Sequence, residues 1–76
     1  MEVKIYSTST CPYCTLAKEY LTSKGISFQS IDVSADKTAS EEMIKISGQM
    51  GVPVIVAGDE VIVGFDKGAI NKSLNL

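Results

Sequence analysis

Apolar and polar residues alternate over Val3–Ser7, and this period of two is typical of a β-strand. From Pro12 to about Lys24 the apolar residues recur at helical spacing instead, which predicts an α-helix that Gly25 is suited to end. A second strand is predicted from Phe28 to Val33. The apolar face of the predicted helix consists of Tyr13, Leu16, Ala17, Tyr20 and Leu21.

A second helix is predicted to begin at a capping box, because Thr38 is followed three residues later by Glu41. This helix is expected to end at Ser47 and Gly48. Its expected apolar stripe consists of Ala39, Met43 and Ile46.

Two more strands are predicted, from Val52 to Val56 and over Glu60–Val63, joined by a tight turn at Gly58-Asp59. Asp66 is suited to cap a short closing helix that runs to about Leu74. The element order is therefore β-α-β-α-β-β-α. We expect an α/β fold in which helices cover both faces of a four-stranded mixed sheet, because a β-α-β crossover gives parallel strands and a hairpin adds an antiparallel one.

Composition limits the classes of function. A chain of 76 residues, 45% of them hydrophobic, predicts one domain over residues 1–76 with a modest core. The net charge of −2 and seven scattered lysines argue against nucleic acid as a partner. No apolar run approaches the ~20 residues of a membrane helix, and there is no signal-peptide pattern. We therefore expect a cytoplasmic protein without membrane partners. We also expect it to be a monomer.

The two cysteines carry the chemistry of this sequence. Cys11 and Cys14 are separated by Pro12 and Tyr13, and they lie where the first strand gives way to the first helix. A helix N-terminus stabilises a thiolate, and Cys14, one turn on, can reach back to form a disulfide with Cys11. Pro12 fits the first helical turn. This pattern predicts a dithiol for thiol–disulfide exchange.

Three other interpretations of the cysteine pair have less support. A structural zinc site needs four ligands, and the chain has no histidine and no second cysteine pair, so we expect no metal site. A structural disulfide across so small a loop would constrain the unfolded chain weakly. Two inert buried cysteines are an unusual choice for a helix start that contains proline. Of the nearby tyrosines, Tyr20 is expected in the core, whereas Tyr13 is better placed to line a site.

The sequence resembles the glutaredoxins, small members of the thioredoxin-fold superfamily, over nearly its whole length. The resemblance implies a thioredoxin fold with Cys11 as the exposed nucleophile and Cys14 as the buried resolving thiol. It also implies a cis Val52–Pro53 bond. Four stretches carry it: Ile5-Tyr6 with Thr10-Cys11-Pro12-Tyr13-Cys14; Ser23-Lys24-Gly25-Ile26; Glu42-Met43-Ile44-Lys45 with Ser47-Gly48-Gln49; and Gly51-Val52-Pro53 with Gly64-Phe65-Asp66.

The resemblance further implies glutathione as co-substrate, with no bound cofactor. Asp66 at a helix start has two roles open to it, as an N-cap or as a contact for the glutathione ammonium group. The segment before the cis-proline would pair with an extended thiol peptide. The residues that correspond to glutathione or substrate contacts in the family are Tyr13, Gln49, Val52, Pro53, Gly64, Phe65 and Asp66.

The chain departs from the glutaredoxin pattern at several of these positions. Thr8 stands where many glutaredoxins carry a lysine, Gly51 replaces the usual threonine, and Lys67 replaces a second aspartate. These departures imply weaker binding of glutathione. In these departures the chain resembles the glutaredoxin-like redoxins. Those proteins supply electrons to ribonucleotide reductase and are recharged by thioredoxin reductase.

The function expected from the sequence is glutathione-dependent reduction of disulfide-containing and glutathionylated proteins. The alternative is electron donation to ribonucleotide reductase, with thioredoxin reductase as the source of electrons. A third possibility is a non-enzymatic iron–sulfur carrier, in which Cys11 from two chains and two glutathiones hold the cluster; Pro12 and the resolving thiol Cys14 argue against it.

Overall fold

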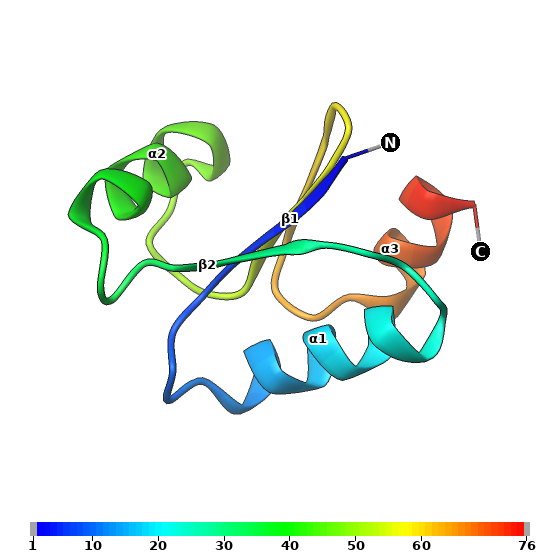
Figure 1. The fold of residues 1–76 in the computed structure, drawn as a ribbon. Helices are drawn as coiled ribbons and strands as arrows, with labels where there is room; N and C mark the ends of the chain where they lie inside the picture. Colours follow the sequence, from blue (N-terminus) through cyan, green and yellow to red (C-terminus); the bar gives the residue numbers. More distant parts are fainter. Residues whose placement is uncertain (1, 76) are drawn as a thin grey trace.

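Seven elements follow one another in the predicted order in a computed structural model, which describes residues 2–75 (Figure 1). Within these residues, no helix combines the length and the apolar character needed to cross a membrane. The elements are β1 (Val3–Ser7), α1 (Pro12–Ser23), β2 (Gln29–Asp32), α2 (Lys37–Ser47), β3 (Val54–Ala57), β4 (Glu60–Val63) and α3 (Lys67–Leu74).

The four strands form one mixed sheet in the order β2-β1-β3-β4. β1 and β2 are parallel, whereas β1 with β3 and β3 with β4 are antiparallel. The turn between β3 and β4 contains Gly58, whose φ of 61° lies in the left-handed region that favours glycine. The predicted crossover and hairpin are therefore both confirmed.

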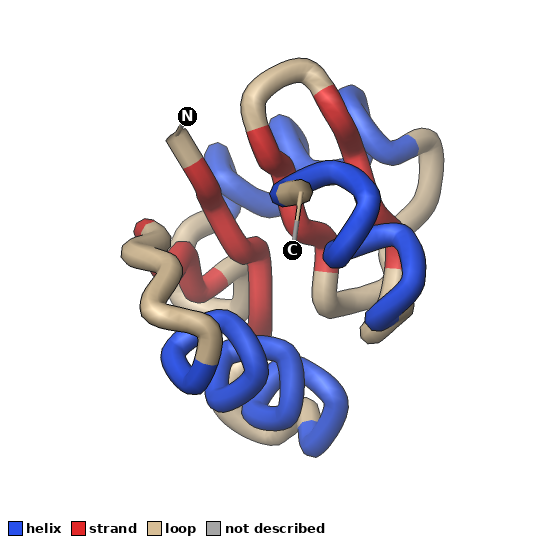
Figure 2. Tube along the Cα trace, turned by 90° about the vertical axis from the view of Figure 1, so that its right-hand side faces the viewer, coloured by secondary structure: helices blue, strands red, loops and turns tan. Residues whose placement is uncertain are grey.

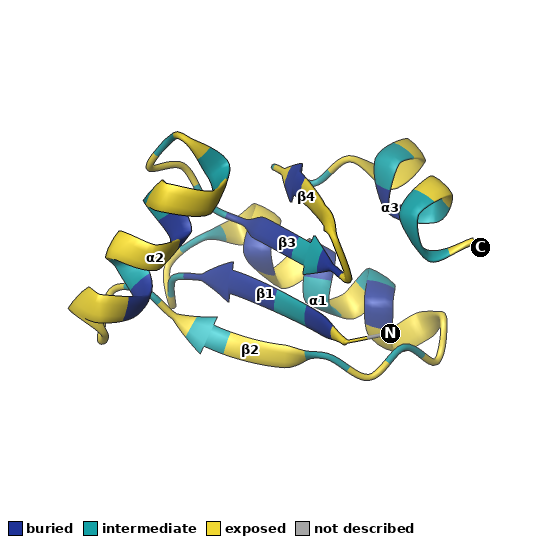
Figure 3. Cartoon of the chain, turned by 90° about the horizontal axis from the view of Figure 1, so that it is seen from above, coloured by how far each residue is buried: buried dark blue, intermediate teal, exposed yellow. Residues whose placement is uncertain are grey.

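Helices lie on both faces of the sheet (Figure 1). Alternate residues of the central strands face opposite layers: Ile5 and Ile55 pack in a core with α1 and α3, whereas Tyr6 and Val54 pack against α2. Figure 2 shows α3 in front of the β3–β4 hairpin, and Figure 3 shows buried residues along β1 and β3 but mostly exposed ones on β2. The chain forms the α/β arrangement predicted from its pattern.

The fold brings two loops together at one end of the sheet. The first loop leaves the C-terminal end of β1 and leads into Cys11 at the start of α1, and the second leads through Val52 and Pro53 into β3. β1 and β3 are antiparallel neighbours with Tyr6 opposite Val54, so the end of β1 and the start of β3 lie at the same edge. This shared edge positions the candidate site.

Two predicted details of α2 are wrong. Its N-cap is Asp36, not Thr38: the Asp36 carboxylate accepts the backbone N–H of Ala39 at 3.1 Å. Aspartate caps a helix as well as threonine does, so the helix begins earlier than the capping-box pattern indicates. Ile46 is 40% exposed, and Ile44 packs against the core instead.

The predicted face of α1 is also too broad. Ala17 and Leu21 are fully buried, but Leu16 is 44% exposed, and Tyr20 is only partly buried. The observed second and third strands, β2 and β3, start and end within two residues of the predicted bounds. Strand ends depend on pairing between strands, which a single-strand pattern does not define.

Candidate active site

Cys11 is the N-cap residue of α1, and its sulfur serves as the capping acceptor. Its Sγ accepts the backbone N–H of Cys14 at 3.3 Å, in the manner of a capping side chain. Pro12 occupies the first turn, where a backbone N–H has no partner within the helix, so its missing N–H costs no hydrogen bond. The N–H group and the positive end of the helix dipole both favour negative charge on this half-buried sulfur.

Cys14 lies behind Cys11 and is almost inaccessible, with 1% of its surface exposed. Burial, followed by the hydrogen bond with Cys11, raises the pKa of the Cys14 thiol from 9.0 to about 11. A backbone hydrogen bond from Thr8 and the positive charge of Lys18 act in the opposite direction. At neutral pH Cys14 is therefore a protonated thiol beside an accessible sulfur, and the two cysteines are chemically unequal.

The cis-proline loop faces Cys11. The Val52–Pro53 bond is cis, as the resemblance implies, and the Val52 carbonyl lies 3.8 Å from Cys11 Sγ. Pro53 is buried, while Val52 is half-buried. Among residues 2–75, no hydrogen bond uses the Val52 N–H. The Val52 backbone therefore presents a donor beside the sulfur, where an extended peptide could pair with it.

Gln49 lies in the same loop, but its side chain is turned inward, toward the backbone of its own loop and Ser47. Its Nε2 donates to the Gly51 carbonyl at 3.0 Å and to Ser47 Oγ at 3.3 Å. Its Oε1 accepts the Gly51 N–H. The sequence does not indicate that Ser47 and Gly51 hold Gln49, since the only signal is a glycine two residues after a glutamine.

Gly64, Phe65 and Asp66 join this region from the other side of β3. The Gly64 N–H donates to the Pro53 carbonyl at 2.8 Å, so this segment is fastened to the cis-proline loop. Asp66 is the N-cap of α3, and its carboxylate accepts the N–H of Ala69 at 3.1 Å. The capping role proposed for Asp66 is confirmed.

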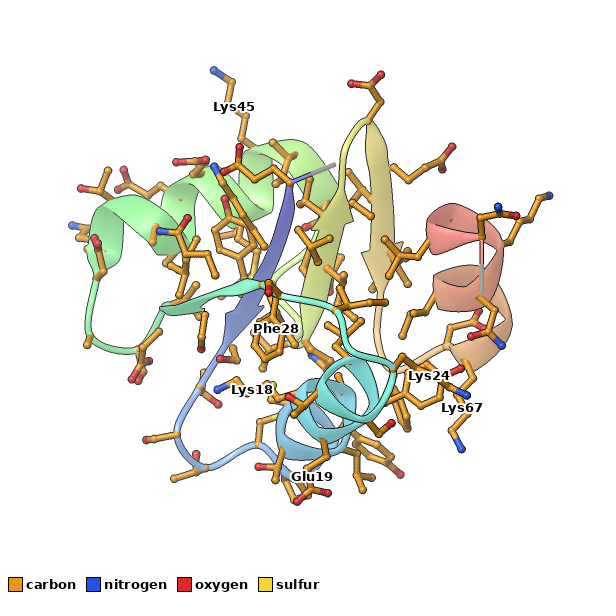
Figure 4. The ribbon with its side chains drawn as sticks, turned by 45° about the vertical axis from the view of Figure 1, so that its right-hand side comes forward. Lys18, Glu19, Lys24, Phe28, Lys45 and Lys67 are labelled. Atoms are coloured by element: carbon orange, nitrogen blue, oxygen red, sulfur yellow. The ribbon has the colours of Figure 1, made fainter. Side chains whose placement is uncertain are left out.

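Phe65 continues into an aromatic and basic cluster that the sequence did not indicate. Its ring meets the Tyr20 ring edge-on at a centroid distance of 5.9 Å, and Tyr20 donates a hydrogen bond to Asn71. The Lys24 and Lys67 ammonium groups lie 5.6 and 5.5 Å from the centre of the Tyr20 ring. Figure 4 labels these two lysines, which lie on the same side of the molecule. Tyr20 thus packs against the core, as expected, and also links α1 to α3.

Exposed and uncharged residues surround the dithiol. Tyr13, between the cysteines, is 64% exposed, which is consistent with a place on the rim of a site. Met50, in the loop before Val52, is 76% exposed. Residues 7–17 and 46–58 contain no charged side chain. Charged groups must therefore approach a bound substrate from other segments, such as Lys18 or the start of α3.

A cavity with a volume of about 770 Å³ lies elsewhere, between β4 and α3. Asp66 is the one residue of the predicted site that lines it, together with Ile62, Lys72 and others. Neither cysteine lines this cavity, and Tyr13 between them is exposed. This suits exchange with a partner that brings its own sulfur to the surface.

Fold and site together define a thioredoxin-like protein with one half-buried and one fully buried thiol. The model of the glutaredoxin family, described as "Glutaredoxin", matches residues 3–62. The chain is 51% identical over 70 residues to an uncharacterized glutaredoxin-like 8.6 kDa protein of a rubredoxin operon in Clostridium pasteurianum, covering 92% of this chain and 93% of that protein. It is 47% identical over 64 residues to glutaredoxin 3 of Escherichia coli K12, covering 84% and 77%.

The fold also matches solved structures. The glutaredoxin-like protein NrdH-redoxin from Escherichia coli, which has a thioredoxin-like activity profile, superimposes with a TM-score of 0.86 at 30% identity, over 95% of this chain and 93% of that one. The chain therefore belongs to the glutaredoxin family. Members of this family are thiol–disulfide oxidoreductases, and this protein is a thiol redox protein of that family.

Proposed function

We propose that this protein is a glutathione-dependent thiol–disulfide oxidoreductase that reduces protein disulfides and glutathione mixed disulfides. The observation that carries the proposal is the inequality of the two cysteines. Cys11 Sγ is accessible and caps a helix, whereas Cys14 is buried with a pKa of about 11. An accessible nucleophile with a protonated partner directly behind it suits a two-step exchange.

In the first step the Cys11 thiolate attacks the glutathione sulfur of a mixed disulfide. A new disulfide forms between Cys11 and glutathione, and the substrate leaves as a thiolate that takes up a proton. In the second step a free glutathione thiolate attacks the glutathione sulfur, which restores the Cys11 thiolate and releases oxidised glutathione. Free glutathione is thus the reductant, and the reaction needs no resident cofactor.

Protein disulfides require the second cysteine. Attack by Cys11 joins the two proteins through a mixed disulfide, and Cys14 then loses its proton and attacks Cys11 Sγ. The substrate leaves fully reduced, and a Cys11–Cys14 disulfide remains on this protein. Two glutathiones reduce this disulfide again. The 3.3 Å contact between Cys11 Sγ and the Cys14 N–H supports this step, because it holds the two residues one helical turn apart.

For glutathione itself, the start of α3 offers the best electrostatic match. Its N-terminal N–H groups suit a carboxylate, and the Asp66 carboxylate suits an ammonium group. Tyr13 is exposed enough to pack on the peptide, and the Val52 backbone can pair with it. The test is a coupled assay in which NADPH and glutathione reductase regenerate glutathione while the protein reduces a glutathionylated peptide. Catalysis that depends on added glutathione supports the proposal.

A second candidate is an electron donor to ribonucleotide reductase that thioredoxin reductase recharges. The similarity to NrdH-redoxin and the uncharged surroundings of the dithiol favour it, since glutathione carries two carboxylates and Thr8 offers no cation for either. The same assay distinguishes the two when thioredoxin reductase replaces glutathione and its reductase. Rapid NADPH oxidation with thioredoxin reductase alone, and none with glutathione, would replace the first proposal by the second.

A further inference from the structure

Gln49 and Gly51 form a closed pair of hydrogen bonds directly before the cis-proline loop. The Gln49 side-chain amide accepts the N–H of Gly51 and donates to its carbonyl, so one amide group engages both polar groups of one residue. The second N–H of this amide is directed to Ser47 Oγ at 3.3 Å. Both donors of the Gln49 amide are therefore in use.

The anchor of this arrangement is the end of α2. Ser47 is the last residue of the helix, and its hydroxyl donates to the Met43 carbonyl one turn earlier at 2.6 Å. The same hydroxyl accepts from Gln49. The hydrogen bonds thus run from the rigid helix through Ser47 and Gln49 to Gly51, the residue before Val52, whose carbonyl faces Cys11 Sγ.

Gly51 has no conformational need to be glycine. Its φ is not among the positive values found at Gly25, Gly48, Gly58 and Gly64. A Cβ built at Gly51 meets one side chain within 4 Å, that of Gln49, whose Oε1 would lie 2.6 Å away. The glycine is therefore required by the inward position of Gln49, and any side chain at position 51 must displace that amide.

We infer that Gln49 is a positioning residue that favours protein disulfides over glutathione mixed disulfides. By holding both polar groups of Gly51, it fixes the neighbouring Val52 backbone, with its unused N–H, for pairing with an extended protein segment. Because both of its own donors are engaged, Gln49 has none for a glutathione carboxylate. The inference rests on the proposed exchange at Cys11 and adds its preferred substrate class.

The first test compares Gln49→Ala with the parent on two substrates, a protein disulfide such as that of insulin and a glutathionylated peptide. Loss of the two neutral hydrogen bonds to Gly51 predicts a rise in KM for the protein disulfide of about three- to tenfold, with kcat nearly unchanged. For the glutathionylated peptide we expect no change in KM. Gln29→Ala, which removes an exposed glutamine on the outer strand β2, is the matched control.

The second test uses the steric conflict at position 51. Gly51→Thr displaces the Gln49 amide and frees its donors, so KM for the glutathionylated peptide should fall by a factor of about three while KM for the protein disulfide rises. Adding Gln49→Ala to Gly51→Thr should abolish that gain. Gln49 then affects glutathione use only when residue 51 carries a side chain, which a purely structural role does not predict.

Failure of this inference is distinct from failure of the proposed function. If Gln49→Ala in the parent raises KM for the glutathionylated peptide, Gln49 binds glutathione directly and the inference is overturned, while exchange at Cys11 stands. A readout without turnover is the ¹⁵N resonance of the Gln49 side-chain amide. Its signals should not move when S-methylglutathione is added, and a saturable shift of those signals would overturn the inference even in an inactive protein.

Discussion

The sulfur of Cys11 accepts the backbone N–H of Cys14 at 3.3 Å, so Cys11 is itself the N-cap of α1. This contact has two consequences. It directs a helix N–H group at the charge that the reaction requires on Cys11, and it places the second thiol one turn behind it. One hydrogen bond therefore directs an N–H group at the Cys11 sulfur and also holds the two cysteines one helical turn apart.

The two cysteines should differ in which of the two activities they support. Cys11→Ser should abolish reduction of both glutathionylated peptides and protein disulfides, since no other accessible thiol is present. Cys14→Ser should retain deglutathionylation and lose reduction of protein disulfides, because only the latter needs a resolving thiol. Steady-state rates with the two substrates measure this. A Cys14→Ser protein that is inactive toward glutathionylated peptides would contradict the assigned roles.

The Cys14 thiol should titrate late. Burial raises its pKa from 9.0 to about 11, so the native protein favours the protonated form. In a Cys11→Ser protein, where burial remains the main cause, alkylation of Cys14 by iodoacetamide should be slow at pH 8 and accelerate only above pH 9. The stability gained from keeping this thiol protonated is complete below pH 9 and is lost as the pH rises toward 11. Rapid alkylation at neutral pH would contradict the buried position.

Tyr6 should contribute to stability through Glu42. Its hydroxyl donates to the Glu42 carboxylate at 2.9 Å, and burial, then this hydrogen bond, raises the pKa of Tyr6 from 10.0 to about 12. Tyr6→Phe should lower the free energy of unfolding by about 1–3 kcal/mol at neutral pH. The raised pKa means that the folded protein holds the Tyr6 proton more tightly than the unfolded chain does. The difference between the two proteins should therefore shrink as the pH rises from 10 toward 12. Tyr13→Phe, at an exposed tyrosine, is the control in urea unfolding.

Much of the fold can be predicted from the sequence, because period-two and helical patterns of apolar residues have a direct physical cause. Ile5 and Leu21 are buried where the pattern places them, and Asp66 caps α3 as predicted. Asp36 was missed because two polar residues two positions apart can each cap a helix. The choice between Ile44 and Ile46 depends on how α2 is rotated over the sheet, which its own sequence does not define.

The candidate site also has features that the sequence predicts and features that it does not. The roles suggested for Cys11 and Cys14 rest on local spacing and a helix start, which a sequence displays. The inward position of Gln49 and the link from Tyr20 to Phe65 arise from side-chain contacts within a loop and between helices. Such contacts depend on tertiary geometry and leave little trace in the pattern of residues.

Two leucines of α1 should contribute very differently to the free energy of unfolding. Leu21 is fully buried between the helix and the sheet, whereas Leu16 is 44% exposed. Leu21→Ala should therefore lower the free energy of unfolding by about 2–5 kcal/mol. Leu16→Ala should change it by less than about 0.5 kcal/mol. Equal losses in the two variants, measured by urea unfolding, would show that α1 packs on the sheet in a different rotation.

A positive charge at position 8 should improve the use of glutathione. Thr8 lies three residues before Cys11, and its backbone already reaches the dithiol. Thr8→Lys should lower KM for a glutathionylated peptide by a few-fold, as expected for a partly exposed ion pair of about 0.2–1 kcal/mol. The gain should fade at high salt because the interaction is screened. Thr10→Lys, on the same loop, is the matched control.

The covalent intermediate on Cys11 offers the sharpest measurement of the proposed exchange. Cys14→Ser protein is mixed with a glutathionylated peptide, the reaction is quenched with acid, and the intact mass of the protein is measured. We predict one glutathione on each chain, located at Cys11 by peptide mapping, with the substrate peptide released as a free thiol. A chain that carries the substrate peptide in place of glutathione, or no adduct at all, would contradict nucleophilic attack by Cys11 on the glutathione sulfur.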